Sequence, residues 1–351
     1  MAIQQIEVKN FIVLTDTYQV IDVRSPAEYK HAHIPNAINL PLFTDYERAI
    51  VGTAYKQKSR EEAIKMGLDY FGPRMRNIVE EVEALISIHN DPGDKTILVH
   101  CWRGGMRSEA VAWLLNLYGF KVYLLIGGYK KFRNWVLTQF DIPYPFNVLG
   151  GYTGSGKTKL LASLENQGFK IIDLEGLAKH KGSAFGNINM PDQPSQEMFE
   201  NLLATELFRK SADGGQDSIW LEDESQRIGH VNLPHSMWRT MSNSKIFFLE
   251  LPFEARLNYL VLEYGNLSKS RMIDAITRIQ KRLGHLEAQN TINFLHDNDP
   301  KEAFRILLKY YDKWYLKGLH RRENLDQLLI KVPCADVHEI DNSKKILELN
   351  L

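Results

Sequence analysis

The chain has 351 residues, a length that favours two domains, and its 44% hydrophobic and 25% charged residues are ordinary for a globular protein. Its 43 basic and 43 acidic residues cancel, which excludes binding to nucleic acid through bulk positive charge. No apolar run approaches the roughly 20 residues that cross a bilayer, and the first ten residues lack the apolar core of a signal peptide, so we expect a cytoplasmic protein without a membrane partner.

Short apolar segments alternate with helical patterns in the first part of the chain. Strands are predicted at 18–23, 96–100 and 122–125, and helices at 78–88, 107–117 and 129–138. This alternation predicts an α/β domain with a parallel sheet over residues 1–140. Pro143 and Pro145 follow it and predict an extended connector.

A second α/β pattern begins after the prolines. Strands are predicted at 146–149, 169–173, 218–221, 245–249 and 327–332, and helices at 253–264, 269–286, 300–315 and 343–349. Helices dominate after residue 252. We therefore expect a second α/β domain with a helical appendage over residues 146–351.

The segment 151–158 (GYTGSGKT) matches the phosphate-binding P-loop, G-x4-G-K-[ST], and lies between a predicted strand and a helix. Small residues let successive backbone N–H groups turn toward an anion, as predicted for Gly151, Gly154, Ser155 and Gly156. Lys157 would then meet the terminal phosphate and Thr158 would ligate Mg²⁺. The motif predicts a P-loop NTPase-like domain.

A P-loop site also needs a carboxylate at the end of a neighbouring strand to hold Mg²⁺. Glu222 and Asp223 end the predicted strand 218–221, and we predict that they join Thr158 in a metal site. Three acidic residues in a row also suit a solvated loop. Asp173, at the end of strand 169–173, is either a catalytic base or a helix N-cap.

The segment 100–108 (HCWRGGMRS) follows a predicted strand and precedes a helix. Loop amides, the helix N-terminus and the guanidinium groups of Arg103 and Arg107 would favour the thiolate of Cys101 over its thiol. We predict a nucleophile in an anion cradle, with these three residues catalytic. The alternative is a buried structural cysteine. His100 is expected to be structural, and Cys334 incidental.

Several short motifs in the first domain resemble a known family. The segments 20–29 (VIDVRSPAEY), 33–37 (HIPNA) and 39–41 (NLP) look like the N-terminal half of a rhodanese domain. The cysteine loop and the segment 127–129 (GGY) complete the pattern, so the resemblance covers residues 1 to about 140. The first domain is therefore identified as rhodanese-like.

A rhodanese domain followed by a P-loop domain is similar to the bacterial tRNA 2-selenouridine synthases. The segments 181–186 (KGSAFG), 193–196 (QPSQ), 222–225 (EDES) and 227–229 (RIG) support this resemblance. It implies a transferase that acts on a wobble 2-thiouridine of tRNA in two steps. Geranyl diphosphate first alkylates the sulfur to give S-geranyl-2-thiouridine, and selenium from selenophosphate then replaces that sulfur. The resemblance also implies that Cys101 carries selenium and that the P-loop holds a diphosphate, with or without a nucleotide.

One departure from the family pattern concerns the cysteine loop. Arg107 lies six residues after Cys101, one more than in sulfurtransferase rhodaneses, and this spacing is typical of cysteine phosphatases. A wider loop suits a tetrahedral anion, and selenophosphate and a phosphatase substrate both qualify. Two alternatives stay open: a cysteine phosphatase or sulfurtransferase fused to a P-loop kinase, and a non-catalytic pairing of an ATP switch with a partner-binding rhodanese domain.

Two basic segments are candidates for contact with tRNA. Lys179 and Lys181 flank His180, whereas Arg271, Arg278 and Arg282 share a narrow arc of a predicted helix with apolar residues opposite. A basic face suits phosphate tracking, but any solvated surface helix has the same pattern. No interleaved aromatic pattern in the sequence singles out a residue that stacks on bases.

Overall fold

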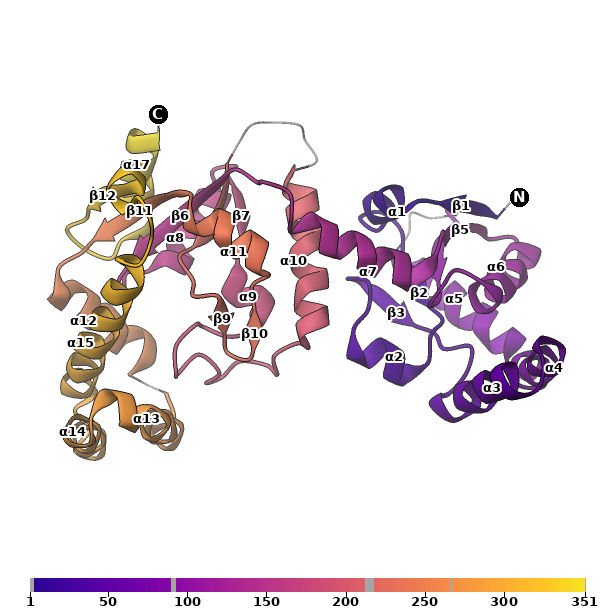
Figure 1. Ribbon diagram of the computed structural model, residues 1–351, viewed down its shortest axis with the longest axis horizontal. Coiled ribbons are helices and arrows are strands. Elements are labelled where there is room, and N and C mark those ends of the chain that lie inside the picture. The colour runs from indigo at the N-terminus through magenta and orange to yellow at the C-terminus, as the bar shows by residue number, and fades with distance from the viewer. Residues whose placement is uncertain (1–2, 90–92, 212–217, 266, 351) are drawn as a thin grey trace. The chain divides into compact units, whose positions relative to one another are not determined.

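The protein's structure is a computed structural model that describes residues 3–89, 93–211, 218–265 and 267–350. Internal contacts divide the chain into two compact units. The first comprises Met1–Gln139 with Glu200–Thr205, and the second comprises Phe140–Phe199 with Glu206–Leu351. Each unit contains a five-stranded parallel sheet with helices packed around it, which confirms the predicted α/β class (Figure 1).

The sheet of the first unit has the strand order β1-β5-β4-β2-β3. Its strands are β1 (Gln4–Ile6), β2 (Val20–Asp22), β3 (Ala37–Asn39), β4 (Thr96–His100) and β5 (Lys121–Leu125). Its helices are α1 (Val8–Leu14), α2 (Pro26–His31), α3 (Asp45–Gln57), α4 (Arg60–Phe71), the 3₁₀ turn η1 (Gly72–Arg74), α5 (Met75–His89), α6 (Met106–Tyr118) and α7 (Gly128–Gln139). Asp22 pairs in register with His100, so β2 and β4 end side by side.

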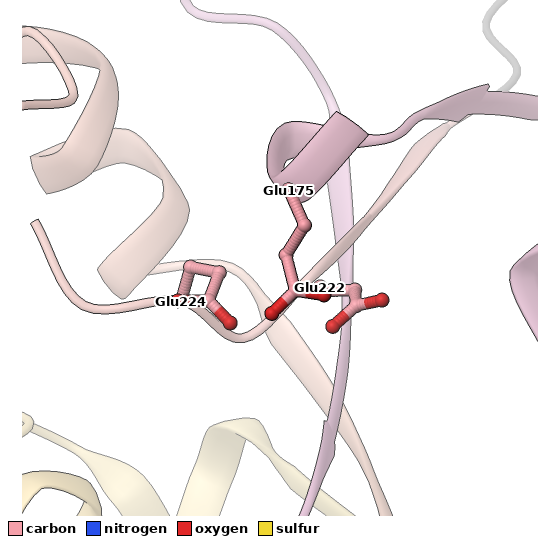
Figure 2. A group of neighbouring side chains, drawn as sticks. All are labelled: Glu175, Glu222 and Glu224. Atoms are coloured by element: carbon pink, nitrogen blue, oxygen red, sulfur yellow. The ribbon is translucent and has the colours of Figure 1, made fainter. Parts of the chain in front are cut away.

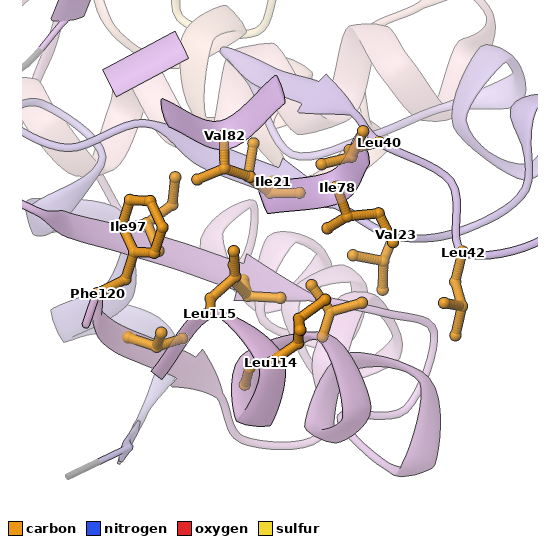
Figure 3. Close-up of a cluster of buried hydrophobic side chains, with 14 of the residues drawn as sticks. Ile21, Val23, Leu40, Leu42, Ile78, Val82, Ile97, Leu114, Leu115 and Phe120 are labelled. Atoms are coloured by element: carbon orange, nitrogen blue, oxygen red, sulfur yellow. The ribbon is translucent and has the colours of Figure 1, made fainter. Parts of the chain in front are cut away.

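The core of the first unit forms where α5 and α6 pack on the sheet (Figure 3). Ile21 and Ile97 from the strands meet Val82 of α5 and Leu115 of α6, and all four are fully buried. Each such side chain contributes roughly 1.5–3 kcal/mol relative to exposure. This packing fixes the end of β4 against α6 and so sets the position of the loop between them.

The sheet of the second unit has the strand order β12-β11-β6-β8-β7. Its strands are β6 (Phe146–Gly151), β7 (Lys170–Ile172), β8 (Ile219–Glu222), β11 (Lys245–Glu250) and β12 (Leu329–Pro333), and β9 (Arg227–Ile228) pairs with β10 (Val231–Asn232) as a separate hairpin. Leu149 pairs in register with Glu222. The central strand β6 and its neighbour β8 therefore end at the same edge.

The helices of the second unit cover this sheet and extend beyond it. They are α8 (Lys157–Glu165), α9 (Leu174–Ala178), α11 (His235–Ser242), α12 (Phe253–Tyr264), α13 (Lys269–Leu283), α14 (His285–His296), α15 (Pro300–Leu319), α16 (Leu325–Leu328) and α17 (Glu339–Asn350), and α10 (Gln196–Ser211) contributes residues to both units. Within the described residues, no helix is both long enough and apolar enough to cross a membrane.

The helical appendage corrects one prediction. The expected single helix 269–286 is two helices, because Gly284 adopts a left-handed φ of 108° between α13 and α14. Glycine is the residue that takes this conformation without steric cost. The apolar spacing that predicted one helix continues across the break, so the spacing alone did not reveal it.

Candidate functional site

The cysteine loop connects β4 to α6. Cys101 directly follows β4, and α6 begins after Gly105, which provides no side-chain cap for the first amides of the helix. The residue is 3% exposed and contacts the core, but its sulfur accepts a 3.1 Å hydrogen bond from the Ser108 hydroxyl. Cys101 is therefore buried among apolar groups on one side and faces a polar donor on the other.

Two glycines allow the loop to approach α7 closely. Gly104 and Gly128 have φ values of 65° and 59°, and a Cβ on Gly128 would lie 2.4 Å from both the Cys101 carbonyl oxygen and the Gly104 nitrogen. The Tyr129 amide donates to the Cys101 carbonyl at 2.8 Å. The cysteine loop therefore packs directly against the start of α7, at the GGY segment.

The two arginines of the loop have different surroundings. Nη1 of Arg107 donates to Oε2 of Glu28 at 2.9 Å. Burial alone would raise the pKa of Glu28, but the hydrogen bond and charge of Arg107 outweigh it and hold that pKa below its usual value. Arg103 is exposed, and no acceptor in the described part of the chain is recorded for its guanidinium. Arg103 is therefore the loop cation that is available to an anion.

Beneath the loop lies a fully buried ion pair. Nη2 of Arg24 lies 2.6 Å from Oδ2 of Asp22 and also donates to the Ala32 carbonyl. His100 is buried beside this pair, and burial lowers the pKa of its imidazole. The buried position of His100 is consistent with the structural role expected for it. The ion pair lies where β2 and β4 end.

The second unit holds the P-loop between β6 and α8. Gly156 has φ 73° and precedes α8, and Lys157 donates to the Gly151 carbonyl at 3.3 Å. Gly154 has φ 80°, and a Cβ there would lie 2.9 Å from Leu260 Cγ. Ser155 is buried and its hydroxyl donates to the Tyr152 carbonyl at 2.7 Å. The predicted phosphate-binding residues therefore form one continuous turn.

Three glutamates gather beside the P-loop (Figure 2). Glu175 of α9, Glu222 at the end of β8 and Glu224 each offer a carboxylate oxygen, and these atoms lie within 4.8 Å of one another. Burial and mutual repulsion raise the pKa of Glu175 to about 9 and that of Glu224 to about 8. The Thr158 hydroxyl donates to Glu222 at 2.6 Å. Carboxylate oxygens of this kind are the ligands that Mg²⁺ prefers.

The Asp223 carboxylate bonds to protein donors outside the glutamate cluster. Its Oδ2 accepts a 2.6 Å hydrogen bond from the Tyr315 hydroxyl, and its Oδ1 pairs with Arg322. The same Tyr315 oxygen accepts from the Gly151 amide at 3.1 Å. Both oxygens of Asp223 are used by protein donors, so the structure does not bring it to Thr158 as predicted. Asp173 caps α9 by accepting from the Gly176 amide at 2.8 Å.

The two basic segments lie close together in the second unit. Arg278 donates to the Ala184 carbonyl at 3.1 Å, and Arg271 reaches Asn189 at 3.4 Å. Lys181 lies 5.3 Å over the Tyr264 ring. A Cβ on the adjacent Gly182 would lie 2.9 Å from the carboxylate oxygens of Glu175 and Glu224. The segment that carries Lys181 therefore contacts both α13 and the glutamates.

The remaining two basic candidates are near the same elements. Lys179 ends α9 in a left-handed conformation with φ 51° and is exposed. Burial raises the pKa of Tyr310 on α15, and the positive charge of Arg282 partly offsets that rise.

Sequence reasoning missed several residues of these sites. Glu28 and Ser108 were within quoted motifs, but only the fold shows that they contact Arg107 and Cys101. Glu175 follows β7, which pairs with β8. Because the carboxyl ends of parallel strands lie at one edge of a sheet, the position of Glu175 just after a predicted strand could have indicated that it lies near Glu222.

Comparison with known proteins gives matches over both units. Residues 144–344 match the family model described as the tRNA 2-selenouridine synthase AAA domain, and residues 7–134 match the rhodanese-like domain. The tRNA 2-selenouridine synthase of Sulfurovum sp. (strain NBC37-1) is 34% identical, with 91% of this chain and 93% of that protein covered. The synthase of Hydrogenovibrio crunogenus is 37% identical, with 87% and 90% covered. That of Shewanella sediminis is 34% identical, with 93% and 94% covered.

Proposed function

The chain belongs to the tRNA 2-selenouridine synthase family, enzymes that modify tRNA, and we propose that it converts wobble 2-thiouridine to 2-selenouridine through S-geranyl-2-thiouridine. The observation that carries the proposal is that one chain holds both a cysteine loop and a P-loop, each with the groups its step requires. The substrates are geranyl diphosphate, selenophosphate and tRNA.

We assign the alkylation step to the P-loop. The amides of Gly154, Ser155 and Gly156, together with Lys157, would hold the diphosphate that departs as the geranyl group moves to sulfur. The P-loop therefore has to bind a diphosphate, which need not belong to a nucleotide. A thiolate is a poor leaving group, so alkylation prepares the sulfur at C2 for replacement.

The glutamate cluster fits a divalent cation. Burial and the closeness of the carboxylates raise the pKa values of Glu175 and Glu224, because ionising them together is costly, and a bound cation would lower that cost. We propose that Thr158 and Glu222 would hold Mg²⁺, with Glu224 and Glu175 in the place predicted for Asp223. When bound, Mg²⁺ neutralises charge on a diphosphate.

We assign the selenium step to the cysteine loop. A Cys–Se intermediate would need a two-electron oxidant, because the selenium of selenophosphate is already at the selenide level, so we assign Cys101 an attack on carbon. With Arg103 and the uncapped amides of α6 binding selenophosphate, the Cys101 thiolate would attack C2 of S-geranyl-2-thiouridine and displace geranyl thiol. Ser108 would stabilise the thiolate through its hydrogen bond, while Arg107, fixed by Glu28, would hold the loop in its wide form. The selenium of selenophosphate would then displace the Cys101 sulfur from C2, and water would cleave the Se–P bond to release phosphate.

The loop spacing also supports a second candidate, a cysteine phosphatase fused to a P-loop kinase. Such an enzyme would release phosphate from p-nitrophenyl phosphate, and Cys101→Ser would abolish the release. The proposed synthase would show no such Cys101-dependent hydrolysis.

Reconstitution with purified full-length protein tests the proposal. The substrate is an anticodon stem-loop RNA with 2-thiouridine at the wobble position, and nucleosides are identified by mass spectrometry. Geranyl diphosphate alone should give S-geranyl-2-thiouridine, and selenophosphate added next should give 2-selenouridine. ATP in place of geranyl diphosphate should give neither. Selenation without geranyl diphosphate, or no product with both substrates, would contradict the proposal.

A further inference from the structure

Helix α15 carries exposed aromatic rings on its outer side. Trp314 is 44% exposed, and the half-buried Tyr310 lies one helical turn before it, with ring centroids 6.3 Å apart. The Lys317 ammonium lies 5.1 Å from the Trp314 ring centroid. A surface cation therefore reaches the ring, and the large indole is not part of the core.

A row of cations runs beside these rings. Lys309, Lys313 and Lys317 are exposed at four-residue spacing, and Arg321 continues the spacing just after the helix ends. Residues at this spacing share one side of a helix. The rings and this row together form the aromatic–basic face of α15, which comprises Lys309, Tyr310, Lys313, Trp314, Lys317 and Arg321.

The charge of this face is not cancelled within the helix. Between Lys309 and Arg321 the only acidic residue is Asp312, whose carboxylate is paired with Arg256 at 2.8 Å. In a chain whose net charge is zero, this is a local positive patch with flat rings inside it.

The inner side of the same helix contacts the P-loop. Tyr315, the neighbour of Trp314, bonds the Gly151 amide at 3.1 Å and Asp223 at 2.6 Å. The aromatic–basic face is therefore carried by the helix that braces the phosphate-binding turn, within one unit of the protein (Figure 1).

We propose that the aromatic–basic face of α15 binds the unpaired loop of an RNA hairpin, with Trp314 stacking on a base and the lysine row contacting phosphates. The proposal rests on the proposed function, which makes tRNA the substrate. Single-stranded bases are recognised by aromatic rings flanked by cations, because every base has a stacking face and every linkage a negative charge. Neither group alone would distinguish RNA from another polyanion.

Fluorescence anisotropy with the full-length protein tests this face. The two probes are a labelled RNA hairpin with an unpaired loop and the same hairpin with abasic loop residues. The variants are Trp314→Ala and the conservative Trp314→Phe, and the matched control is Trp113→Ala on α6, whose indole is 52% exposed. Thermal melting of each variant checks its fold.

We expect Trp314→Ala to bind the base-containing hairpin roughly tenfold more weakly and to lose the preference over the abasic hairpin. Trp314→Phe should keep most of that preference, and Trp113→Ala should match wild type. Lys313→Gln with Lys317→Gln should weaken both probes and flatten the salt dependence of binding.

Equal RNA binding by Trp314→Ala and wild type would overturn the inference and leave the proposed function standing. If Trp314→Ala weakened the binding of both probes equally, the inference would also be overturned, since the face would then serve any polyanion, including an acidic protein. Failure of wild type to bind any RNA would overturn the proposed function and the inference together.

Discussion

The Thr158 hydroxyl donates a 2.6 Å hydrogen bond to Oε1 of Glu222, which joins the first turn of α8 to the end of β8. Strand β6, which precedes the P-loop, pairs in register with β8, so the contact follows from the sheet order. A hydroxyl and a carboxylate are thereby held together beside Lys157 before any ligand binds. This arrangement gives the P-loop its proposed cation site.

Replacing Thr158 with valine removes the hydroxyl and keeps the shape. We expect Thr158→Val to lose the Mg²⁺-dependent part of its affinity for geranyl diphosphate, about tenfold, while Thr158→Ser keeps it. Calorimetric titration with and without Mg²⁺ measures the difference. A valine variant with an unchanged Mg²⁺ effect would remove Thr158 from the cation site.

The glutamate cluster predicts a pH-dependent stability. Folding raises the pKa of Glu175 to about 9 from a usual value of 4.5. The folded chain therefore holds a proton that the unfolded chain releases, and stability falls as pH rises from about 4.5 to 9. At pH 8, Glu175→Gln should melt at a higher temperature than wild type, by about 2–4 °C per kcal/mol of relieved repulsion. At pH 4 the two proteins should have the same melting temperature.

Thermal melting across this pH range, with Mg²⁺ present and absent, tests the relation. Mg²⁺ should raise the melting temperature of wild type more than that of Glu175→Gln. The exposed Glu348→Gln on α17 is the control and should behave as wild type. A wild-type protein whose stability does not fall above pH 5 relative to Glu175→Gln would contradict the raised pKa.

Two adjacent glycines of the cysteine loop give a matched pair of variants. A Cβ on Gly104 would lie 2.7 Å from the Leu125 carbonyl oxygen at φ 65°, whereas a Cβ on Gly105 would meet nothing within 4 Å. Gly104→Ala should destabilise the protein by about 1–2 kcal/mol or more, because L-residues resist this conformation. Gly105→Ala should change the free energy of unfolding little. Denaturant titration measures the free energy of unfolding of both variants. Equal values for the two would show that the loop does not have the conformation described.

Ser108 offers a test of the thiolate environment. In a Cys334→Ala background, where Cys101 is the remaining thiol, Ser108→Ala should slow alkylation of Cys101 by iodoacetamide about tenfold, since the hydrogen bond that the proposed thiolate would accept is lost. Ser87→Ala, on the exposed side of α5, is the control. Faster alkylation of Ser108→Ala would mean that Ser108 limits access to the sulfur instead of stabilising its charge.

Both candidate loops could be located from the sequence, because each is a contiguous motif whose proposed chemistry depends on neighbours along the chain. The strand–loop–helix context of Gly151–Thr158 and of Cys101 needs no long-range information. The pairing of Thr158 with Glu222 was also foreseeable, since P-loop folds place a carboxylate at the end of the adjacent strand.

The parts that sequence did not predict depend on direction and on distant contacts. Glu222, Asp223 and Glu224 are consecutive acids, and only the fold shows that the middle one turns toward Tyr315. The exposure of Trp314 was equally unpredictable, because α15 turns Tyr315 toward the P-loop and leaves the neighbouring indole exposed. A helical pattern gives the spacing of such residues, but the packing partner decides which side is free.

The most direct test of the account is mass spectrometry of tRNA nucleosides from cells whose only copy of the protein carries Cys101→Ala or Lys157→Ala. The tRNA of Cys101→Ala cells should contain no 2-selenouridine and should accumulate S-geranyl-2-thiouridine, because alkylation is assigned to the P-loop. Lys157→Ala should contain neither nucleoside and should retain 2-thiouridine. Normal 2-selenouridine in the Cys101→Ala cells would contradict the central claim that this sulfur is the nucleophile of the selenium step.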